Sequence, residues 1–569
     1  MPEERFDAIV VGSGFGGSVT ACRLAEAGQT VLVLERGQPY PPGSFARTPH
    51  GMRTNFWSPE DGLFGLFDIC SFSGLDVITA SGLGGGSLIY ANVMLRKDEH
   101  TFVREDVLDG GYEDWPLTRA DLEPHYDRVE ARQRPEPYPL GHQPYAATRK
   151  TLAMLEAANA LGLPCHLPKI AVRFAADGED PAPGRPISEP RPNLHHAPRL
   201  TCQLCGECDV GCNIGAKNTL DFTYLSDAQQ AGAVLRTCCE ARLLEPRPGG
   251  DWALTYVQHL GARGGHREDL LDPEHRPRRT VVSSRVILAA GAVGSPRLLL
   301  ANRATLPGLS PQLGRRVSAN GDAIGWIRDA SRVGDDGARQ PRYLDPSRGP
   351  VITASIDVPA DRSPSGREFH IQDAGAPAFS EWMWQGLEVP GNVWRMRRRL
   401  VRRMVAHLRG RRRTRLGGLV SGLLGTTGTS AAMMPVLAMG RDIPDGRYRL
   451  AGDELELDWS SEPSDAYYRG VHEGFHRVAK AIGGRASDDP LERLNKNVTV
   501  HPVGGCPMGE DARRGVVDPW GQVYGKPGLY VADGSALPGP VGPNPSFTIA
   551  AFADRVADGI LAGRPAGST

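Results

Sequence analysis

Short apolar runs, each ending at a glycine or an acid, open the chain. Residues 6–11 (Phe-Asp-Ala-Ile-Val-Val) end at Gly12, and a second apolar run over 30–34 ends in Glu35. Runs of this length that are apolar nearly throughout indicate strands buried on both faces, as in a parallel sheet. The segment between them has a helical pattern that closes at Gly28. The opening of the chain therefore predicts strand, glycine turn, helix and strand.

The same texture returns further along the chain. An apolar run over 281–290 leads into a second glycine turn, and another over 529–532 precedes a helix that we expect from Asn544 onward. Between 316 and 490 the pattern changes to the alternation of half-buried strands, interrupted by Pro and Gly. Two kinds of sheet are therefore expected, one mostly parallel and one mixed.

The first glycine turn has the spacing of a dinucleotide fingerprint. Gly12, Gly14 and Gly17 stand where a strand turns into a helix whose free N–H groups must approach a pyrophosphate. Glu35, at the end of the next strand, is placed to accept hydrogen bonds from a ribose hydroxyl. An acid at this position disfavours a 2′-phosphate, so either FAD or NAD fits.

These patterns predict an α/β protein in which a Rossmann-like domain, doubly wound and mostly parallel, is interleaved with a mixed-sheet α+β substrate domain. Residues 134–200 are Pro-rich with little periodicity, and we expect a surface excursion there. The predicted nucleotide-binding domain has three pieces, over 1–133, 219–315 and 491–569. The excursion with its cysteine cluster occupies 134–218, and the substrate domain occupies 316–490.

Composition and charge narrow the class of protein. The 569 residues include 65 Lys or Arg and 66 Asp or Glu, a net charge of −1 that lacks the electrostatic signature of a general nucleic-acid binder. We find no run of about 18 predominantly apolar residues, as a membrane span would need. The chain reaches an apolar strand within its first residues, with no basic region or cleavage site before it, so we expect a cytoplasmic protein.

Several motifs spread along the chain resemble those of the glucose–methanol–choline (GMC) flavoprotein oxidoreductases, and among them most closely the bacterial cholesterol oxidases. The motifs are Gly82-Leu-Gly-Gly-Gly-Ser-Leu88, Thr219-Leu-Asp-Phe-Thr-Tyr-Leu225, Gly291-Ala-Val-Gly-Ser-Pro296, His501-Pro-Val-Gly-Gly-Cys506, and Leu529-Tyr-Val-Ala-Asp-Gly-Ser535 through Pro543-Asn-Pro545. The resemblance implies bound FAD. It assigns roles in holding the FAD to Gly12, Gly14, Gly17, Glu35, Gly86, Asn92, Asp533, Gly534 and Asn544.

Oxidation of an alcohol by a flavin needs a base for the hydroxyl proton while a hydride leaves the carbon. Histidine suits this role because its ordinary pKa is about 6.5, and the resemblance places His501 at the family's catalytic position. The sequence predicts that Asn544 is the N-cap of a helix that begins with Pro545. The resemblance implies that the Asn544 amide points at the flavin or the substrate. Glu381 aligns loosely with a glutamate that moves protons in cholesterol oxidases.

One motif departs from the sterol oxidase pattern. Cys202, Cys205, Cys208 and Cys212 have the spacing of a bacterial ferredoxin run, with Asn213 where proline would follow. Three interpretations stay open: a [4Fe–4S] cluster, a structural zinc site, or free or redox-paired thiols. The fourth cluster ligand is either Cys212 or a cysteine from elsewhere, such as Cys238 or Cys239.

A basic segment raises the question of a membrane. Residues 395–415 contain eleven Arg, with apolar residues at helical spacing, which predicts an amphipathic helix that could lie on anionic lipid. The alternative is an ordinary solvated helix. Docking is attractive because a sterol substrate resides in membranes.

Three functions follow in order of preference. The first is FAD-dependent oxidation of a bulky lipid-like alcohol, a 3β-hydroxysterol above all, with His501 as base and oxygen as a natural acceptor. The second is a related alcohol or steroid dehydrogenase that passes electrons through a cysteine-bound cluster to an acceptor protein. The third, from another class, is a non-catalytic flavin electron-transfer protein.

Overall fold

A five-stranded parallel sheet forms the centre of the first domain. The computed structural model describes residues 3–103, 114–259, 276–333, 337–378, 433–488 and 496–564. The sheet has the order β11 (Val234–Arg236), β3 (Val31–Leu34), β2 (Ala8–Val11), β15 (Val286–Leu288) and β26 (Leu529–Val531), with all neighbours parallel. Four of these strands are buried throughout, as their apolar composition predicts. The Rossmann-like fold is confirmed.

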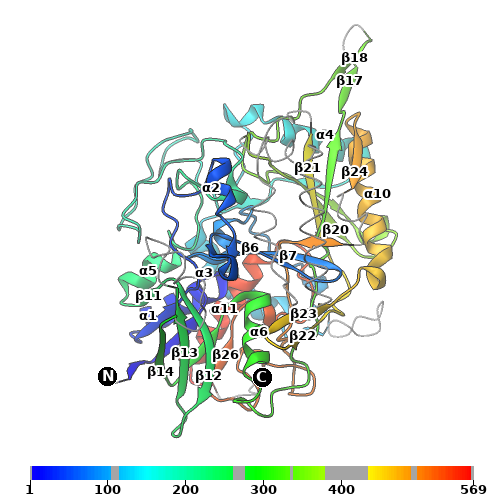
Figure 1. The fold of residues 1–569 in the computed structure, drawn as a ribbon. Helices are drawn as coiled ribbons and strands as arrows, with labels where there is room; N and C mark the ends of the chain where they lie inside the picture. The colour runs from blue at the N-terminus through cyan, green and yellow to red at the C-terminus, as the bar shows by residue number, and fades with distance from the viewer. Residues whose placement is uncertain are drawn as a thin grey trace.

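Helices cover this sheet and bury much of their own surface. They include α1 (Phe15–Glu26), α3 (Arg119–Gln133), α5 (Tyr224–Gln230) and α11 (Ser546–Leu561). Helix α1 packs against α11 and α5, and α11 packs against α3, so the two ends of the chain meet in one core (Figure 1). Helix α11 is buried on nearly every side because it lies between α1 and α3.

The apolar run over 281–290 forms two strands instead of one. Strand β14 (Arg278–Ser283) joins β1 (Glu4–Phe6), β13 (Trp252–Gln258) and β12 (Cys239–Pro246) in a four-stranded sheet, whereas β15 joins the parallel sheet. The Ser283 hydroxyl donates to the Arg285 carbonyl at 2.8 Å and accepts from the Arg285 amide at 3.0 Å. This local turn takes the backbone out of one ladder and into the other.

The second domain is built on a six-stranded sheet. Its order is β24 (Arg485–Asp488), β16 (Ala323–Arg328), β21 (Met434–Gly440), β20 (Phe369–Asp373), β19 (Ser355–Val358) and β9 (Cys165–His166), and its neighbours are antiparallel. Helices α10 (Asp465–Ala481) and α4 (Arg149–Leu161) pack together and against this sheet (Figure 1). Because side chains alternate along a strand, residues such as Ile371 face the helices and residues such as Gln372 face the other way.

Part of the segment 134–218, where we expect a surface excursion, belongs to the second domain. Helix α4 and strand β9 both fall within it, and both are built into the second domain. Helix α4 ends at Gly162, whose φ of 62° is the left-handed C-cap conformation that favours glycine. Proline-rich sequence in this segment obscured the helical pattern of α4 in the sequence.

Smaller elements join the two domains and decorate them. Strands β25 (Asn497–Thr499), β7 (Leu75–Ala80) and β6 (Phe67–Ser71) form a three-stranded sheet, and α6 (Gly291–Ala301) packs on β22 (Arg447–Ala451). The remaining elements are α2 (Pro49–Arg53) and the strands β4 (Trp57–Ser58), β5 (Leu63–Phe64), β8 (Glu136–Pro137), β10 (Lys169–Ile170), β17 (Ser331–Val333), β18 (Arg339–Pro341) and β23 (Glu454–Asp458).

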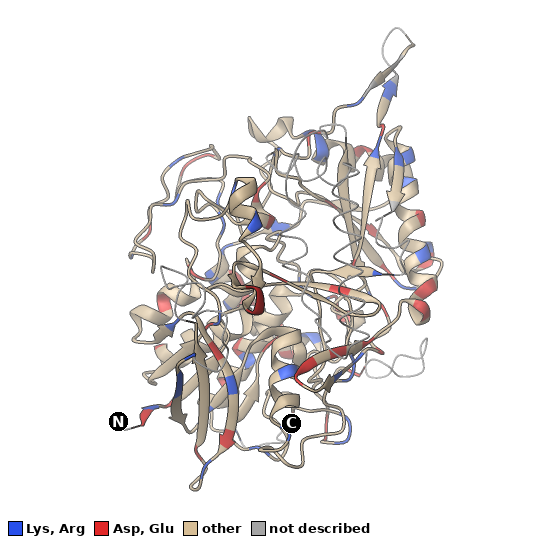
Figure 2. Ribbon diagram, viewed as in Figure 1, with Lys and Arg blue, Asp and Glu red and all other residues tan. Residues whose placement is uncertain are grey.

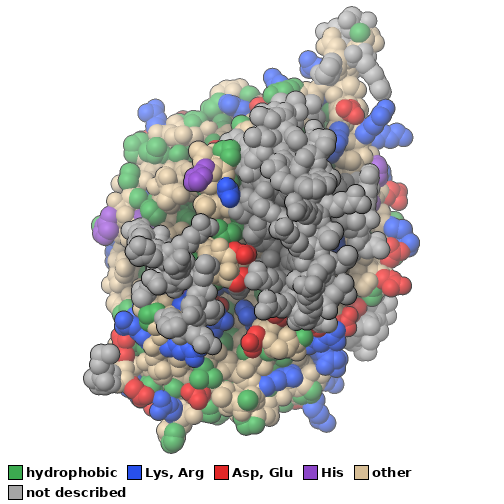
Figure 3. Space-filling view, in the orientation of Figure 1, with side chains coloured by type: hydrophobic (Ala, Val, Ile, Leu, Met, Phe, Trp, Pro, Cys, Tyr) green, Lys and Arg blue, Asp and Glu red, His purple; other side chains and the backbone are tan. Residues whose placement is uncertain are grey.

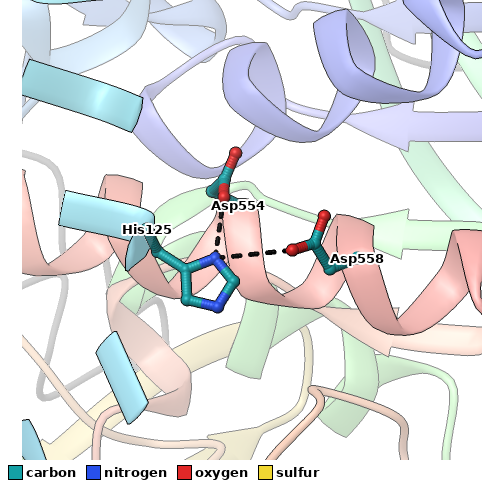
Figure 4. A group of neighbouring side chains, drawn as sticks. All are labelled: His125, Asp554 and Asp558. Atoms are coloured by element: carbon teal, nitrogen blue, oxygen red, sulfur yellow. Dashed lines mark hydrogen bonds and ion pairs between the residues drawn. The ribbon is translucent and has the colours of Figure 1, made fainter. Parts of the chain in front are cut away.

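A buried ion-pair network ties α3 to α11. His125 Nδ1 lies 2.7 Å from Asp554 Oδ2 and 3.9 Å from Asp558 Oδ2 (Figure 4). Arg23 and Arg128 also pair with both carboxylates. Since two guanidinium groups already balance the acids, this cluster serves to fasten helices and has no free capacity for a metal ion.

The described surface carries charges of both signs side by side (Figures 2 and 3). This mixture agrees with a net charge of −1. Within the described residues, no helix is both long enough and apolar enough to cross a bilayer.

Candidate active site

A large cavity of about 1380 Å³ lies where the two domains meet. The carboxyl ends of β2, β3, β15 and β26 form one wall of it, which is the usual ligand side of a parallel sheet. The six-stranded sheet forms another wall through its face opposite the helices. The wall contributed by this sheet is apolar and consists of Ile324, Trp326, Pro435 and Leu437.

The first glycine turn sits at the head of the cavity. Gly12 has a φ of 97°, and a Cβ on it would lie 2.3 Å from the Ala289 carbonyl oxygen. Gly14 lines the cavity just before α1 begins. Gly17 lies behind the turn, where a Cβ would meet the Gly12 oxygen at 2.0 Å. The first two glycines therefore face the ligand space, and the third permits close packing of helix on turn.

Glu35 lines the same end of the cavity and is held firmly. Its carboxylate accepts hydrogen bonds from the Ser13 amide at 3.1 Å, the Ser13 hydroxyl at 2.6 Å and the Gly37 amide at 2.8 Å. Burial raises the pKa of Glu35, and the bonds from Ser13 and Gly37 oppose that rise. A buried, oriented acceptor at the end of the second strand suits a ribose hydroxyl.

The second glycine cluster forms a tight turn, η2 (Gly85–Leu88), beside the first. A Cβ on Gly85 would lie 2.6 Å from Gly14 Cα, so the two glycine turns touch. Gly86 lines the cavity and has open space where a Cβ would stand. Asn92 is fully buried and is not among the residues that line the cavity.

Asp533 and Gly534 follow β26 at the same edge of the sheet as the first glycine turn, where a Cβ on Gly16 would lie 3.1 Å from Asp533 Cα. The Asp533 carboxylate accepts from the Gly291 amide at 2.8 Å and from the Ser295 and Ser535 hydroxyls at 2.5 Å each. Burial raises its pKa, although these bonds favour the charged form. Asp533 thereby joins the glycine turn that begins at Gly291 to the C-terminal strand β26. Asp533 and Gly534 both line the cavity.

His501 also lines the cavity and is paired with a buried carboxylate. Its Nδ1 lies 2.8 Å from Asp322 Oδ1. The other oxygen of Asp322 accepts from the Thr499 hydroxyl at 2.8 Å and from the Val500 amide at 2.9 Å. Because a carboxylate can only accept, Nδ1 carries the proton and the neutral ring keeps its lone pair on Nε2. His501 is therefore set up as a proton acceptor.

Asn544 is buried and lines the cavity, but it does not cap the helix. Helix α11 begins at Ser546 with Pro545 as its N-cap, and no side chain caps it. Asn544 Oδ1 instead accepts from Gln372 Nε2 at 3.1 Å. The capping role expected from the sequence is thus wrong by one residue. The bond from Gln372 fixes the carbonyl end of the amide, which turns its NH₂ group toward other partners.

A side chain that sequence reasoning did not single out joins the segments that carry His501 and Asn544. Asn320 Oδ1 accepts from the Val541 amide at 2.7 Å, and Asn320 Nδ2 donates to the Pro543 carbonyl at 3.1 Å. Asn320 precedes Asp322 by two residues, so one short loop orients His501 and also holds the segment that ends in Asn544. Its φ of 55° is left-handed, a conformation that asparagine tolerates.

We expect Asn320→Ala to lower the free energy of unfolding by about 1–3 kcal/mol, because buried partners of Asn320 lose their hydrogen bonds. Asn320→Gly is the matched variant, since it removes the same side chain but accepts the positive φ without strain. Denaturant unfolding of both variants measures the two costs separately. Equal stability of wild type and Asn320→Gly would show that the side-chain clamp contributes nothing.

Three residues thus enter the site from the structure alone, namely Asn320, Asp322 and Gln372. The sequence did carry a faint signal for two of them, because Asn320-Gly321 is a turn dipeptide followed by an acid. Nothing in the chain pairs Asp322 with His501, which lies 179 residues away. Glu381 and the basic segment 395–415 fall outside the described residues.

The four cysteines of the ferredoxin-like run come together beside the cavity. Cys202 and Cys208 are buried, Cys212 is half-buried and Cys205 is exposed, and no disulfide joins them. Cys238 and Cys239 lie elsewhere, next to Glu35 and Gly37. In the described part of the chain, which holds all four cysteines of the run, no three of their sulfur atoms lie within 4.8 Å of one another.

The cavity fits FAD. Glycine turns at its head leave backbone N–H groups and no side chains where a pyrophosphate would lie, and Glu35 supplies the ribose acceptor. The space continues past Gly86 to His501 and Asn544, as an extended dinucleotide with a reacting ring requires.

Comparison with known proteins agrees with this geometry. Residues 198–316 and 454–553 match GMC oxidoreductases, and residues 10–50 match an NAD(P)-binding Rossmann-like domain. Cholesterol oxidase of Mycobacterium tuberculosis is 31% identical over 97% of this chain and 90% of its own length. Paromamine 6′-oxidase of Streptomyces fradiae is 26% identical over 98% of this chain and 91% of its own. The crystal structure of pyridoxine 4-oxidase from Mesorbium loti aligns with a TM-score of 0.58 at 17% identity, over 98% of this chain and 99% of that one.

Proposed function

Because the chain belongs to the GMC oxidoreductase family of FAD-dependent enzymes that act on CH–OH groups, we propose that it oxidises the hydroxyl of a bulky, sterol-like alcohol, with His501 as the base. When bound, FAD supplies the acceptor for the hydrogen and two electrons that leave the carbinol carbon. Gly12, Gly14, Glu35, Gly86, Asp533 and Gly534 would hold it, and Gly17 supports the turn from behind.

His501 takes the hydroxyl proton in this proposal. Its Nε2 carries the free lone pair because Asp322 holds the proton on Nδ1. As the imidazole becomes positively charged, the neighbouring carboxylate stabilises that charge. The ring is only partly exposed, which protects the transferred proton from bulk water.

Asn544 positions the substrate hydroxyl or the flavin ring. Gln372 fixes its carbonyl oxygen, so the amide N–H groups are the ones available to the cavity. A donor there would hold the substrate oxygen in line with His501. His501 and Asn544 together then orient one hydroxyl, which is the positioning that a hydrogen transfer requires.

The apolar strand face beside His501 is the observation that carries the substrate proposal. Ile324, Trp326 and Leu437 project from neighbouring strands into the cavity, and Val351 and Ile352 extend the same surface. An aminoglycoside, the kind of substrate named for one relative, is rich in ammonium and hydroxyl groups and would leave them unpaired against this wall. A rigid hydrocarbon skeleton with one hydroxyl fits it, in line with the cholesterol oxidases among the relatives.

Anaerobic bleaching of the flavin tests this proposal. We expect 3β-hydroxysterols to reduce the flavin faster than paromamine or short primary alcohols. Leu437→Ala should lower kcat/KM for the sterol by about 10-fold or more, because a shortened wall loses apolar contact. Leu152→Ala, which alters an exposed leucine on α4, is the control and should leave kcat/KM unchanged. Preference for paromamine would contradict the sterol assignment.

Docking of the segment 395–415 on anionic lipid stays a prediction, as does the cytoplasmic location. A basic amphipathic segment would bring the cavity to the membrane in which a sterol resides. The role of Glu381 in proton movement is likewise a prediction.

A further inference from the structure

We propose that Cys202, Cys205, Cys208 and Cys212 bind a [4Fe–4S] cluster that carries electrons from the flavin cavity to a one-electron acceptor at the surface. The binding site itself is independent of the substrate, but its role as an electron outlet rests on the proposed alcohol oxidation. The spacing of the four cysteines suggests such a cluster, and the structure adds four observations that the sequence does not contain.

The first observation is the separation of the sulfur atoms. A zinc ion with Zn–S bonds of about 2.3 Å would draw its four sulfurs to about 3.8 Å from one another. In the described chain, no three of these sulfurs are within 4.8 Å of each other. All four still interact electrostatically, Cys202 with the other three and Cys205 with Cys208 and Cys212. A four-iron cluster places each thiolate on a different iron and therefore does not need three sulfurs this close together.

The second observation is that a backbone amide points at one of the sulfurs. The Leu204 amide donates to Cys202 Sγ at 3.4 Å. Amide donors of this kind stabilise negative charge on sulfur and adjust the potential of an iron–sulfur centre. An ordinary buried thiol, which behaves as a small apolar group, does not require them.

The third observation is a buried cation behind the run. The Lys217 ammonium donates to the carbonyls of Leu88, Tyr90 and Cys208 at 3.2, 2.8 and 2.8 Å. It also interacts electrostatically with Cys208 and Cys212. A thiolate-ligated cluster carries net negative charge, and a fully buried ammonium beside two of its ligands compensates that charge.

The fourth observation is the position of the run between flavin and solvent. Cys208 begins the short helix η5 (Cys208–Val210), which packs against the glycine turn η2, and Asp209 and Val210 line the flavin cavity. Cys205, on the other side, is exposed. The loop around Phe45 is fixed to the cysteine run by two hydrogen bonds of 3.0 Å, which join the Phe45 backbone to the Asn213 side chain. The four sulfurs therefore connect the interior site to the surface.

The electron balance is simple. Oxidation of one secondary alcohol to a ketone breaks a C–H and an O–H bond and releases two electrons and two protons. His501 takes the hydroxyl proton, and the other hydrogen leaves the carbon with both electrons. Through a one-electron centre, these electrons leave singly and reduce two equivalents of a one-electron acceptor protein, such as a cytochrome. The enzyme would then act as a dehydrogenase, with oxygen as a competing acceptor.

Anaerobic purification followed by reconstitution with ferrous iron and sulfide tests the site. We expect about four iron and four sulfide per chain, as in a [4Fe–4S] cluster, with an EPR signal on reduction. Cys205→Ser and Cys208→Ser should lose this iron and retain FAD. Cys165→Ser, which removes a half-buried cysteine outside the run, is the matched control and should keep the iron. Bound zinc, or iron retained in both run variants, would overturn the proposal.

A second measurement separates the electron outlet from the alcohol oxidation. Sterol should still reduce the flavin in Cys205→Ser and Cys208→Ser, whereas electron transfer from the reduced protein to cytochrome c should be lost. Unchanged reduction of cytochrome c by both variants would refute the outlet. A reconstituted protein that holds iron but whose flavin no alcohol reduces would refute the proposed function and leave the cluster site standing.

Discussion

Replacement of His501 by alanine is expected to lower the rate of anaerobic flavin reduction by about 10²–10⁴-fold, the usual contribution of a positioned general base. The reason is that the hydrogen bond to Asp322 occupies His501 Nδ1 and leaves the lone pair on Nε2 free to act in the cavity. Stopped-flow measurement with the preferred sterol gives this rate directly. The bound FAD should be retained, since no described contact of His501 supports the nucleotide end of the cavity.

His370→Ala is the matched control for this result. His370 forms a similar pair, with Nδ1 at 2.8 Å from Asp357 Oδ1, but it does not line the cavity. Its replacement removes an imidazole from the six-stranded sheet without removing a group that lines the cavity. A fall in rate that is equal for both variants would mean that loss of the domain packing, and not loss of the base, explains the effect.

The local parts of the fold were predictable from sequence because their signals are local. Strands β2 and β3 are apolar on both faces, and Gly12 and Gly14 mark the turn between strand and helix. Each of these features needs only its own neighbourhood and the rule that parallel strands are buried. The same reasoning places Glu35 at the end of a strand, and in the structure its carboxylate is buried and accepts hydrogen bonds from Ser13 and Gly37.

Features that depend on two distant segments were not predictable in this way. The run over 281–290 looks like one strand, because its apolar pattern does not show that Ser283 redirects the backbone into another sheet. Asn544 followed by Pro545 looks like a helix cap, but the bond from Gln372 determines its orientation. A side chain whose partner comes from another domain leaves no periodic trace in the sequence.

The pair of His501 and Asp322 shows the same limit most clearly. His501 could be proposed from the motif around it, whereas Asp322 stands in a turn that follows no periodic pattern. Hydrogen bonds from Thr499 and Val500 bring the two segments together, and these donors are themselves ordinary residues. The residue that sets the proton on His501 was therefore visible only once the two domains were seen in contact.

Asp322→Asn is expected to reduce the rate nearly as much as loss of His501 itself. The Thr499 hydroxyl and the Val500 amide both donate to one oxygen of Asp322, so in the variant the amide oxygen stays with them. The new NH₂ group then faces His501 Nδ1 and can only donate to it. The ring must move its proton to Nε2, which removes the base while the geometry stays the same. In a catalytic Ser-His-Asp triad the same change costs about 10⁴-fold.

Two comparisons make this result specific. Asp357→Asn places the same change in the His370 pair and should leave the rate of flavin reduction unaltered. The double variant Asp322→Asn, His501→Ala should be no slower than His501→Ala alone, since residues that act as a unit are not additive. A double variant slower by the product of both single effects would mean that Asp322 acts on the substrate or the flavin by a route that does not pass through His501. Because Asp322 is buried and its described hydrogen bonds go to Thr499, Val500 and His501, we expect the two losses to merge into one.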